Sequence, residues 1–200
     1  MKHNILVAGV PRAGKSTLSR MVAEACGYQL LCMDAVIAGF ERHFPETGVD
    51  TYADLPSDTI LRHVSGKIAP FLQTVMERGA YDAHGRGMVI DVYQLLPEDF
   101  VRCMRPELCD AYYLVSADVT PEERFALLKA FDTPQDYTFF QSDEQLMEGC
   151  GYMVEQSRLI RDQCRALHLP CYETTRNRTQ VLRQILEEIA QKSRERTQNG

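Results

Sequence analysis

The sequence Asn4-Ile-Leu-Val-Ala-Gly-Val-Pro-Arg-Ala-Gly-Lys-Ser16 joins three structural signals near the start of the chain. Residues 4–8 form a short, nearly continuous apolar run, which is typical of a strand buried on both faces of a sheet. Residues 9–16 match the pattern G-x-x-x-x-G-K-[ST] in full. An amphipathic segment follows over residues 15–26 and stops at Gly27, a favoured position for a glycine that ends a helix. Strand, glycine-rich loop and helix in this order predict a phosphate-binding loop.

The chemistry of such a loop explains why these residue types are needed. Glycines let the backbone N–H groups point inward around a phosphate, and a helix that begins at Lys15 adds unpaired N–H donors. Lys15 would reach the β- and γ-phosphates of a nucleotide, and the Ser16 hydroxyl would ligate Mg²⁺. Arg12 could face an anion or simply solvent. The expected nucleotide-binding residues are Gly9, Pro11, Arg12, Ala13, Gly14, Lys15, Ser16 and Thr17.

Four further apolar runs follow the first, at intervals that leave room for helices. Strands that alternate with helices indicate an α/β fold with a mainly parallel sheet, and right-handed crossovers place the helices on both faces. The fold class is therefore a three-layer, five-stranded domain whose ligands bind at the carboxyl ends of the strands. We expect strands at residues 4–8, 29–33, 88–92, 111–115 and 169–173, and helices at 15–26, 34–43, 57–78, 142–167 and 178–192, with another that starts after Thr120.

Length and composition narrow the class of protein further. The chain has 200 residues, of which 44% are hydrophobic, so we expect one domain over residues 1–193 and a frayed polar tail over 194–200. The net charge of −6 argues against nucleic-acid polymers and membrane surfaces as partners. No apolar run approaches the ~20 residues that span a bilayer. Seven cysteines without a Cys-x-x-Cys pair indicate reduced thiols in a cytoplasmic protein.

Two aspartates at strand ends are candidates for organising a metal and an acceptor. Asp91 lies in the apolar run over residues 88–92, where its carboxylate could hold Mg²⁺ together with Ser16, or cap a turn. Asp34 follows the second expected strand. It could orient the hydroxyl of an acceptor or serve as its general base, or it could cap the following helix. We expect Mg²⁺ at Ser16 and Asp91, and both roles of Asp34 stay open.

The signature motifs of several classes of phosphate-loop protein are absent from this sequence. The L-S-G-G-Q motif of ABC-type ATPases and the N-K-x-D motif of small GTPases are absent. Val92 follows Asp91 where a hydrolytic enzyme of the AAA type would have Glu. The group of small-molecule kinases remains.

Within that group, the chain resembles the nucleoside monophosphate kinases and the shikimate-kinase-like enzymes. The resemblance is carried by GVPRAGKS at residues 9–16, by Asp34, by VIDVYQLLPED at 89–99 and by TPEERFALL at 120–128. It implies a P-loop fold with sheet order 2-3-1-4-5, and ATP and Mg²⁺ as cofactors. It also implies an acceptor-binding helical region at about residues 34–80 and a lid at about residues 131–143.

Lids of this family supply arginines that stabilise the transferred phosphoryl group, yet residues 131–143 contain neither Lys nor Arg. Arg124 and Arg158, on either side of the lid, are the candidate catalytic arginines, and a solvated role is open for each. In the acceptor region, Arg42 and Arg62 could hold the charge of an anionic acceptor, although Arg62 could merely snorkel. Arg176, after the fifth strand, could lie flat against adenine or be exposed.

The sequence thus predicts an ATP- and Mg²⁺-dependent phosphotransferase that acts on a nucleoside monophosphate or on an anionic or hydroxylated metabolite. Lys15 would hold the phosphates, Asp34 would orient the acceptor, and closure of the lid would exclude water. The alternative is a nucleotide-binding regulatory module, or a slow NTPase, without kinase activity, and the arginine-free lid favours it. The acceptor's identity and the oligomeric state stay open.

Overall fold

The expected strands form one parallel sheet. The computed structural model of the chain describes residues 3–79 and 87–198. In this part of the chain the strands are β1 (Asn4–Gly9), β2 (Gln29–Cys32), β3 (Met88–Val92), β4 (Cys109–Val115) and β5 (Cys171–Glu173). Their order is β2-β3-β1-β4-β5, and each neighbouring pair is parallel, which confirms the order that the resemblance implied.

Two strands differ from the sequence prediction at their first residues. β5 begins at Cys171 rather than at residue 169. Pro170 has no amide hydrogen to donate, and only its carbonyl takes part, accepting from the amide of Tyr113 at 3.0 Å. β4 begins two residues earlier than predicted because Cys109 already pairs with Asn4 of β1.

The connecting helices include one that the sequence did not predict, α4 (Pro97–Cys103). Pro97 at its first position and two acids in its first turn are signals that start a helix, but seven residues are too few to show a helical period. The helices are α1 (Lys15–Cys26), α2 (Met33–His43), α3 (Ser57–Gly79), α4 (Pro97–Cys103), α5 (Pro121–Phe131), α6 (Asp143–Ala166) and α7 (Arg178–Gln198), with two 3-10 helices, η1 (Pro45–Thr47) and η2 (Tyr137–Phe140).

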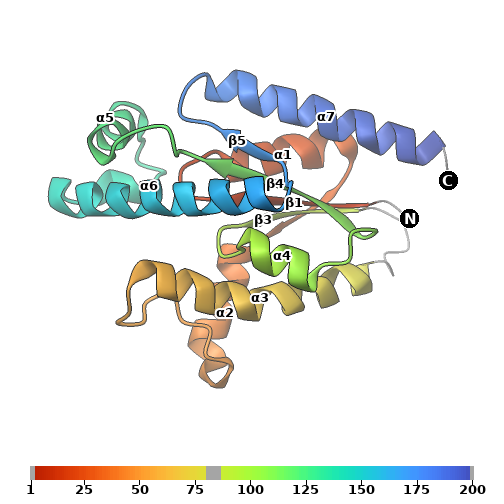
Figure 1. Cartoon of the computed structure of the whole chain (residues 1–200), viewed down its shortest axis with the longest axis horizontal. Helices are drawn as coiled ribbons and strands as arrows, with labels where there is room; N and C mark the ends of the chain where they lie inside the picture. Colours follow the sequence, from red (N-terminus) through yellow and green to blue (C-terminus); the bar gives the residue numbers. More distant parts are fainter. Residues whose placement is uncertain (1–2, 80–86, 199–200) are drawn as a thin grey trace.

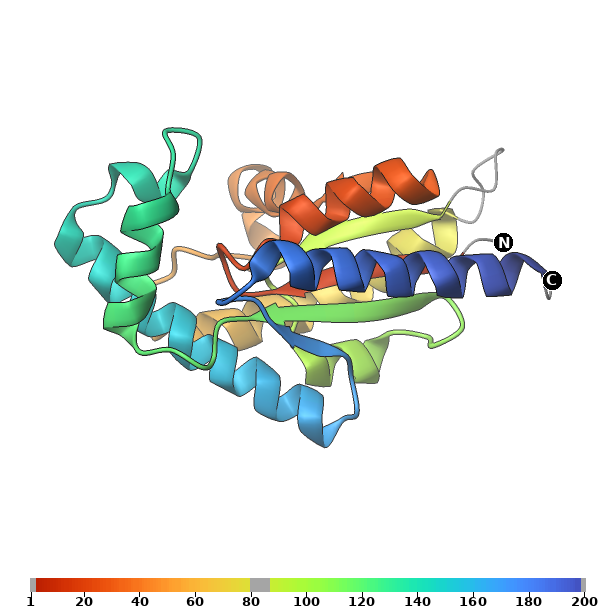
Figure 2. The ribbon, with the colours of Figure 1, turned by 90° about the horizontal axis from the view of Figure 1, so that it is seen from above.

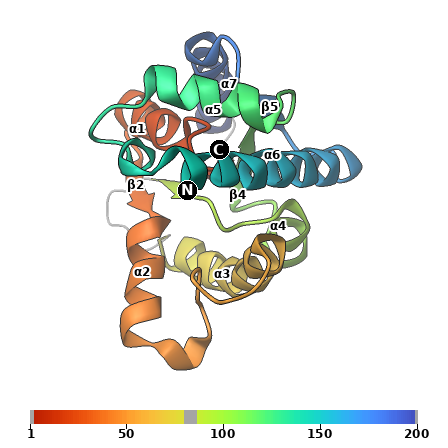
Figure 3. The same cartoon turned by 90° about the vertical axis from the view of Figure 1, so that its left-hand side faces the viewer.

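Helices cover both faces of the sheet, as Figure 1 shows. α1 and α7 pack on one face, and α3, α4 and α6 lie on the other. The sheet is the centre of the core, where Leu6, Ile90 and Leu114 are completely buried. α5 and the first turns of α6 extend beyond the carboxyl ends of the strands (Figure 2), and seen from this end, α2 and α3 lie across from α5 (Figure 3). Among the described residues, no helix combines the length and the apolar character needed to cross a bilayer.

Two capping boxes fix the helices that flank the expected lid. The Thr120 hydroxyl accepts from the amide of Glu123 at 3.2 Å, and the Glu123 carboxylate accepts from the amide of Thr120 at 2.8 Å. Ser142 and Gln145 repeat this arrangement at the start of α6. The start signal at Thr120 is therefore confirmed, and the segment between α5 and α6 is followed by a well-capped helix.

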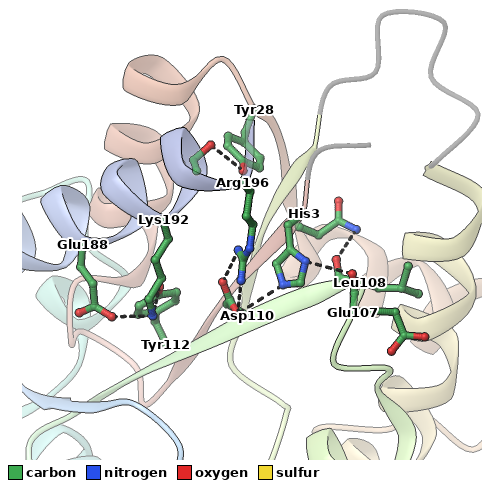
Figure 4. Close-up of polar contacts among 11 residues, drawn as sticks. His3, Tyr28, Glu107, Leu108, Asp110, Tyr112, Glu188, Lys192 and Arg196 are labelled. Atoms are coloured by element: carbon green, nitrogen blue, oxygen red, sulfur yellow. Dashed lines mark hydrogen bonds and ion pairs between the residues drawn. The ribbon is translucent and has the colours of Figure 1, made fainter. Parts of the chain in front are cut away.

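The prediction of a frayed tail over residues 194–200 was wrong for residues 194–198, since α7 continues to Gln198; residues 199 and 200 lie outside the described residues. Figure 4 shows the contacts that hold this end. Arg196 donates two hydrogen bonds to the Asp110 carboxylate, at 2.7 and 3.2 Å, and His3 Nε2 lies 3.3 Å from the same group. One turn earlier, the Lys192 ammonium donates to the Glu188 carboxylate at 2.9 Å and to the Tyr112 hydroxyl at 3.3 Å. Tertiary contacts with β4 thus stabilise a polar segment that has no helical signal of its own.

Candidate active site

The loop after β1 has backbone conformations that favour glycine. Gly9 has a φ of 121° and Gly14 a φ of 99°. A Cβ atom at Gly9 would lie 2.0 Å from the carbonyl oxygen of Leu114, its partner on β4. Gly14 is the N-cap of α1, so that the helix begins at Lys15. The sequence therefore brings a helix N-terminus to the carboxyl end of the central strand, where an anion would find N–H donors.

The Lys15 side chain folds back into this loop. The residue is only 9% exposed, and its Nζ donates to the carbonyl oxygen of Val10 at 2.9 Å. Nζ also lies 5.6 Å from the centre of the Tyr93 ring, within range of a cation–π interaction. Burial lowers the pKa of Lys15, and the charges of Asp91 and Asp34 act to raise it. Since Val10 takes only one of three N–H donors, the ammonium can still bind a phosphate.

Asp91 and Ser16 meet beside Lys15. The Asp91 carboxylate accepts a hydrogen bond from the Ser16 side chain, and the residue is 6% exposed. Burial raises the pKa of Asp91, while Ser16 and Lys15 act to lower it. A hydroxyl and a carboxylate are hard oxygen ligands that suit Mg²⁺, which also takes phosphate oxygens and water. No group of three or more His, Cys, Asp or Glu suited to a metal occurs in residues 3–79 and 87–198, so a Mg²⁺ ion here would depend on the nucleotide for further ligands.

Asp34 lies exposed in the first turn of α2. The N-cap of this helix is Cys32, without a side-chain cap hydrogen bond, so the interpretation of Asp34 as the cap was wrong. The charge of Asp34 acts on the pKa values of both Lys15 and Asp91. The carboxylate therefore lies near the loop, and its role toward an acceptor stays a prediction.

The lid segment contacts the phosphate loop through acids rather than arginines. The Arg12 guanidinium forms ion pairs with both Asp132 and Asp136. Burial acts to lower the pKa of Arg12, and the two aspartates outweigh it and raise the pKa. Thr133 fixes Asp136 by donating its amide and its hydroxyl to the carboxylate, both at 2.9 Å. The prediction for this segment was of missing cations, and it did not include these two acids. Their partner, Arg12, lies 120 and 124 positions away in the sequence.

A cavity of about 500 Å³ lies beside the loop, between α5 and the start of α7. Three arginines line it: Arg12, Arg124 and Arg178. Arg124 is 4% exposed, and its Nη2 donates to the carbonyl oxygen of Pro11 at 3.2 Å. Burial lowers the pKa of Arg124. The remaining lining consists of Leu127, Leu128, Phe131, Asp132, Thr174, Thr175, Asn177, Thr179 and Gln180.

Four arginines that the sequence suggested have other surroundings. Arg158 donates to the carbonyl oxygens of Ala117 (3.4 Å) and Val119 (3.3 Å), so it supports the connection after β4. Arg62 pairs with Glu98 at 2.9 Å, with both side chains about half exposed. Arg42 and Arg176 are exposed. Arg176 is not among the residues that line the large cavity, whereas Arg178, two positions later, is.

A second cavity, of about 100 Å³, lies on the α3 and α6 side of the loop. Tyr93 forms part of its wall, and its hydroxyl donates to Gln156 of α6. The sequence reasoning did not single out these polar residues, because a neutral side chain after a strand carries no motif. The lining residues are Thr51, Ser57, Ile60, Leu61, Tyr93, Gln94 and Gln156.

Comparison with known proteins shows the fold. No family model matches the sequence, and the comparison with curated proteins gives no match. A gluconokinase from Sinorhizobium meliloti 1021 matches with a TM-score of 0.56 and 17% identity, covering 100% of this chain and 98% of that chain. TT1252 from Thermus thermophilus matches with a TM-score of 0.52, 15% identity and coverage of 96% and 98%. A shikimate kinase from Bacteroides thetaiotaomicron matches with a TM-score of 0.50, 14% identity and coverage of 96% and 98%. This chain therefore has the α/β fold of phosphate-loop small-molecule kinases.

Proposed function

We propose that the protein is an ATP- and Mg²⁺-dependent kinase of a small molecule. The observation that carries this proposal is the meeting of Lys15, Ser16 and Asp91 at a helix N-terminus. Arg12 of the same loop lines one cavity, and Tyr93, whose ring lies beside Lys15, lines a second. The arginine-lined cavity is large enough for most of a nucleotide, since ligand pockets usually measure about 300–1,000 Å³. The smaller cavity lies where an acceptor would approach. A kinase needs both compartments, with the phosphates between them.

The nucleotide would lie along the large cavity, with its β- and γ-phosphates in the loop of residues 9–16. Backbone N–H groups and the Lys15 ammonium would bind these phosphates. Arg124 and Arg178 would offset their negative charge, because guanidinium groups stay protonated and match phosphate geometry. Thr174, Thr175 and Asn177 would border the nucleoside. In this arrangement neither Arg158 nor Arg176 contacts the nucleotide: Arg158 has a structural role, and Arg176 is exposed to solvent.

The chemistry at the loop is charge stabilisation and positioning. Mg²⁺, when held by Ser16 and Asp91, would neutralise charge on the phosphates. Arg124 would contribute a fixed positive charge beside the loop, since it is buried against Pro11. Asp34 would orient the acceptor hydroxyl and accept its proton. The segment over residues 131–143 would cover the nucleotide and keep water from competing with the acceptor.

One observation favours the second candidate, a nucleotide-binding module or slow NTPase. Asp132 and Asp136 neutralise Arg12, so the lid adds negative charge beside the cavity that would hold a triphosphate. A module would bind Mg-ATP without turnover, and a slow NTPase would release inorganic phosphate whether or not an acceptor is present.

The test is phosphate transfer from Mg-ATP to an acceptor panel by the wild type and by Lys15→Ala. Removing the ammonium is expected to lower kcat/KM by at least about 100-fold, the usual size of one lost charge-stabilising donor. Lys192→Ala serves as the matched control, because this lysine contacts Tyr112 and Glu188 far from the loop. Unchanged transfer by Lys15→Ala would overturn the proposed role of the loop.

We also propose that the protein works in the cytoplasm. All seven cysteines are free thiols, as expected in a reducing compartment. Alkylation of the protein in freshly lysed cells under denaturing conditions would count these thiols, and disulfide-linked cysteines would contradict the proposal.

A further inference from the structure

We infer that the small cavity beside Tyr93 is the acceptor subsite and that it selects an uncharged, polyhydroxylated molecule, a sugar or a polyol. This inference rests on the proposed kinase function and specifies its acceptor class. It separates the hydroxylated metabolites from the nucleoside monophosphates and carboxylic acids that a kinase of this fold could also take.

Tyr93 connects this cavity to the phosphate loop. It follows β3 directly, and one side of its ring faces the Lys15 ammonium, 5.6 Å from the ring centre. The same residue is part of the cavity wall. An acceptor in the cavity would therefore lie next to the phosphate that Lys15 holds, within the region between α3, the end of β3 and α6.

The cavity offers one buried neutral atom that lacks a hydrogen-bond partner. Gln94 is only 9% exposed, and its Oε1 atom is fully buried with no hydrogen-bond partner among the described residues. Burying an amide without a hydrogen bond is costly, so a ligand that completes the bond would be favoured. A hydroxyl suits this position because it both donates and accepts.

The neighbouring polar groups are also neutral. Gln156 is 5% exposed and accepts a hydrogen bond from the Tyr93 hydroxyl. Burial raises the pKa of Tyr93 to about 12, so the phenol stays protonated at neutral pH. The side chains of Thr51 and Ser57 are hydroxyls, and the lining contains no Lys, Arg, His, Asp or Glu. A wall of amides and hydroxyls beside the aliphatic side chains of Ile60 and Leu61 is suited to a carbon skeleton that carries several hydroxyls.

Charged groups around the cavity disfavour an anionic acceptor. The amide of Thr51 donates to the Glu41 carboxylate at 2.7 Å, which places a negative charge beside one edge of the cavity. Two cations of the acceptor region have other partners: Arg62 pairs with Glu98, and Lys67 donates to the carbonyl oxygen of Thr47. Arg42 is exposed, and it is not among the residues that line the cavity. A phosphate or carboxylate in the cavity would lose water without gaining a cation, and such a loss is unfavourable.

The proposed transfer step has the acceptor in this cavity and Asp34 as the general base. The acceptor's hydroxyl oxygen forms a bond to the γ-phosphorus of ATP as the bond from that phosphorus to the β–γ bridging oxygen breaks. The electron pair of the broken bond leaves with ADP, and the hydroxyl proton passes to the Asp34 carboxylate. The product is a neutral acceptor converted into its phosphate monoester.

The experiment compares neutral acceptors with anionic counterparts in which a carboxylate replaces one neutral end of the carbon chain: glucose with gluconate, and glycerol with glycerate. ADP release from Mg-ATP is measured for each with the full-length protein. The neutral sugar or polyol of a pair is expected to have a kcat/KM at least about tenfold higher than that of its anionic partner. An anion in the cavity would be a buried charge without a partner, which usually costs at least this much in binding. Preferred phosphorylation of an anion would overturn the inference but leave the kinase function standing. Absence of transfer to every acceptor despite Mg-ATP binding would overturn both.

A second measurement locates the subsite. Gln94→Leu is expected to raise the KM for the neutral acceptor by about fivefold to tenfold, as expected for one lost hydrogen bond, and to leave the KM for ATP unchanged. Ser57→Ala, a smaller change in the same wall, should act in the same direction. Gln191→Leu on α7 is the matched control, since its amide contacts the exposed Glu195. Equal effects on both KM values, or none on that of the acceptor, would overturn the assignment of the cavity.

Discussion

Gly9 is the residue of the phosphate loop at which a side chain is expected to be most destabilising. Its φ of 121° lies in the region that L side chains avoid, and a Cβ atom would lie 2.0 Å from the Leu114 carbonyl oxygen. Gly9→Ala is therefore expected to lower the free energy of unfolding by at least about 1–3 kcal/mol, the cost of a strained residue alone. Urea denaturation measures the change.

Gly149 provides the control for this substitution. It lies inside α6, and no atom outside its own helix backbone and chain neighbours approaches within 4 Å of a Cβ built there. Gly149→Ala should stabilise the protein by about 0.5–1 kcal/mol, the helix preference of Ala over Gly. Equal effects of the two substitutions would contradict the geometry described for Gly9.

Single residues also show what spacing can predict and what it cannot. The loop could be predicted residue by residue because Gly9, Gly14 and Lys15 act through a local backbone pattern. The direction of an arginine side chain depends on partners that are distant in sequence. Arg158 binds two carbonyls, while Arg178, which the sequence reasoning did not single out, lines the large cavity. Nothing in the local sequence distinguishes these two environments.

At the scale of elements, the lid segment is the part whose chemistry departs most from expectation. Asp132 and Asp136 hold Arg12 beside the large cavity. A triphosphate must compete with these carboxylates for the same guanidinium, so Asp136→Asn is expected to lower the Kd for Mg-ATP by about twofold to fivefold, the size of one partly exposed ion pair. Isothermal titration calorimetry measures the affinity.

Asp143→Asn is the control for the lid, because Asp143 pairs with Lys129 and both side chains are at least half exposed. Its affinity for Mg-ATP should equal that of the wild type. Weaker binding by Asp136→Asn would show instead that the ion pair holds Arg12 in its binding position, and would contradict the competition described here.

The end of α7 makes a prediction about pH. Burial acts to raise the pKa of Asp110, and His3 and Arg196 outweigh it, so the pKa lies well below its ordinary value of 3.8 (Figure 4). The unfolded chain then takes up a proton at a higher pH than the folded chain does. The stabilisation from Asp110 is therefore complete above pH 3.8 and is lost as the pH falls below it.

Asp110→Asn tests this linkage. The wild type should be the more stable protein at neutral pH, and the difference in unfolding free energy should narrow below about pH 4. Urea denaturation at several pH values measures it, with Asp162→Asn as a control at a side chain that is 66% exposed. A difference that stays constant down to strongly acidic pH would argue against the ion pair.

The elements that the sequence predicted are those with a strong local signal. The periodicity of α1, α3 and α6 and the continuous apolar runs of the strands reflect burial on fixed faces. α4 has start signals but is too short to show a helical period. The last turns of α7 depend on tertiary contacts, such as that of Arg196 with Asp110. Prediction therefore failed where packing, rather than propensity, decides the structure.

For the whole molecule, the strand order places the phosphate loop on the central strand, between two different surroundings. On the α5 and α7 side lies a cavity of about 500 Å³ with three arginines, and on the α3 and α6 side one of about 100 Å³ with neutral walls. Alternation of strands and helices was enough to predict an α/β fold with a mainly parallel sheet, and the resemblance to known kinases implied the strand order. The contrast between the cavities was not predictable, because it arises from side chains of separate elements that meet only in the folded chain.

The proposed activity of this molecule is the transfer of the γ-phosphate of ATP to a small acceptor. Phosphorus-31 NMR of the protein with Mg-ATP and the panel of neutral and anionic acceptors follows every phosphate species at once. We predict a new phosphomonoester signal that grows as the γ-phosphate signal falls, in the same amount as the ADP formed. A spectrum in which ATP persists, or in which inorganic phosphate is the sole product beside ADP, would contradict the proposal.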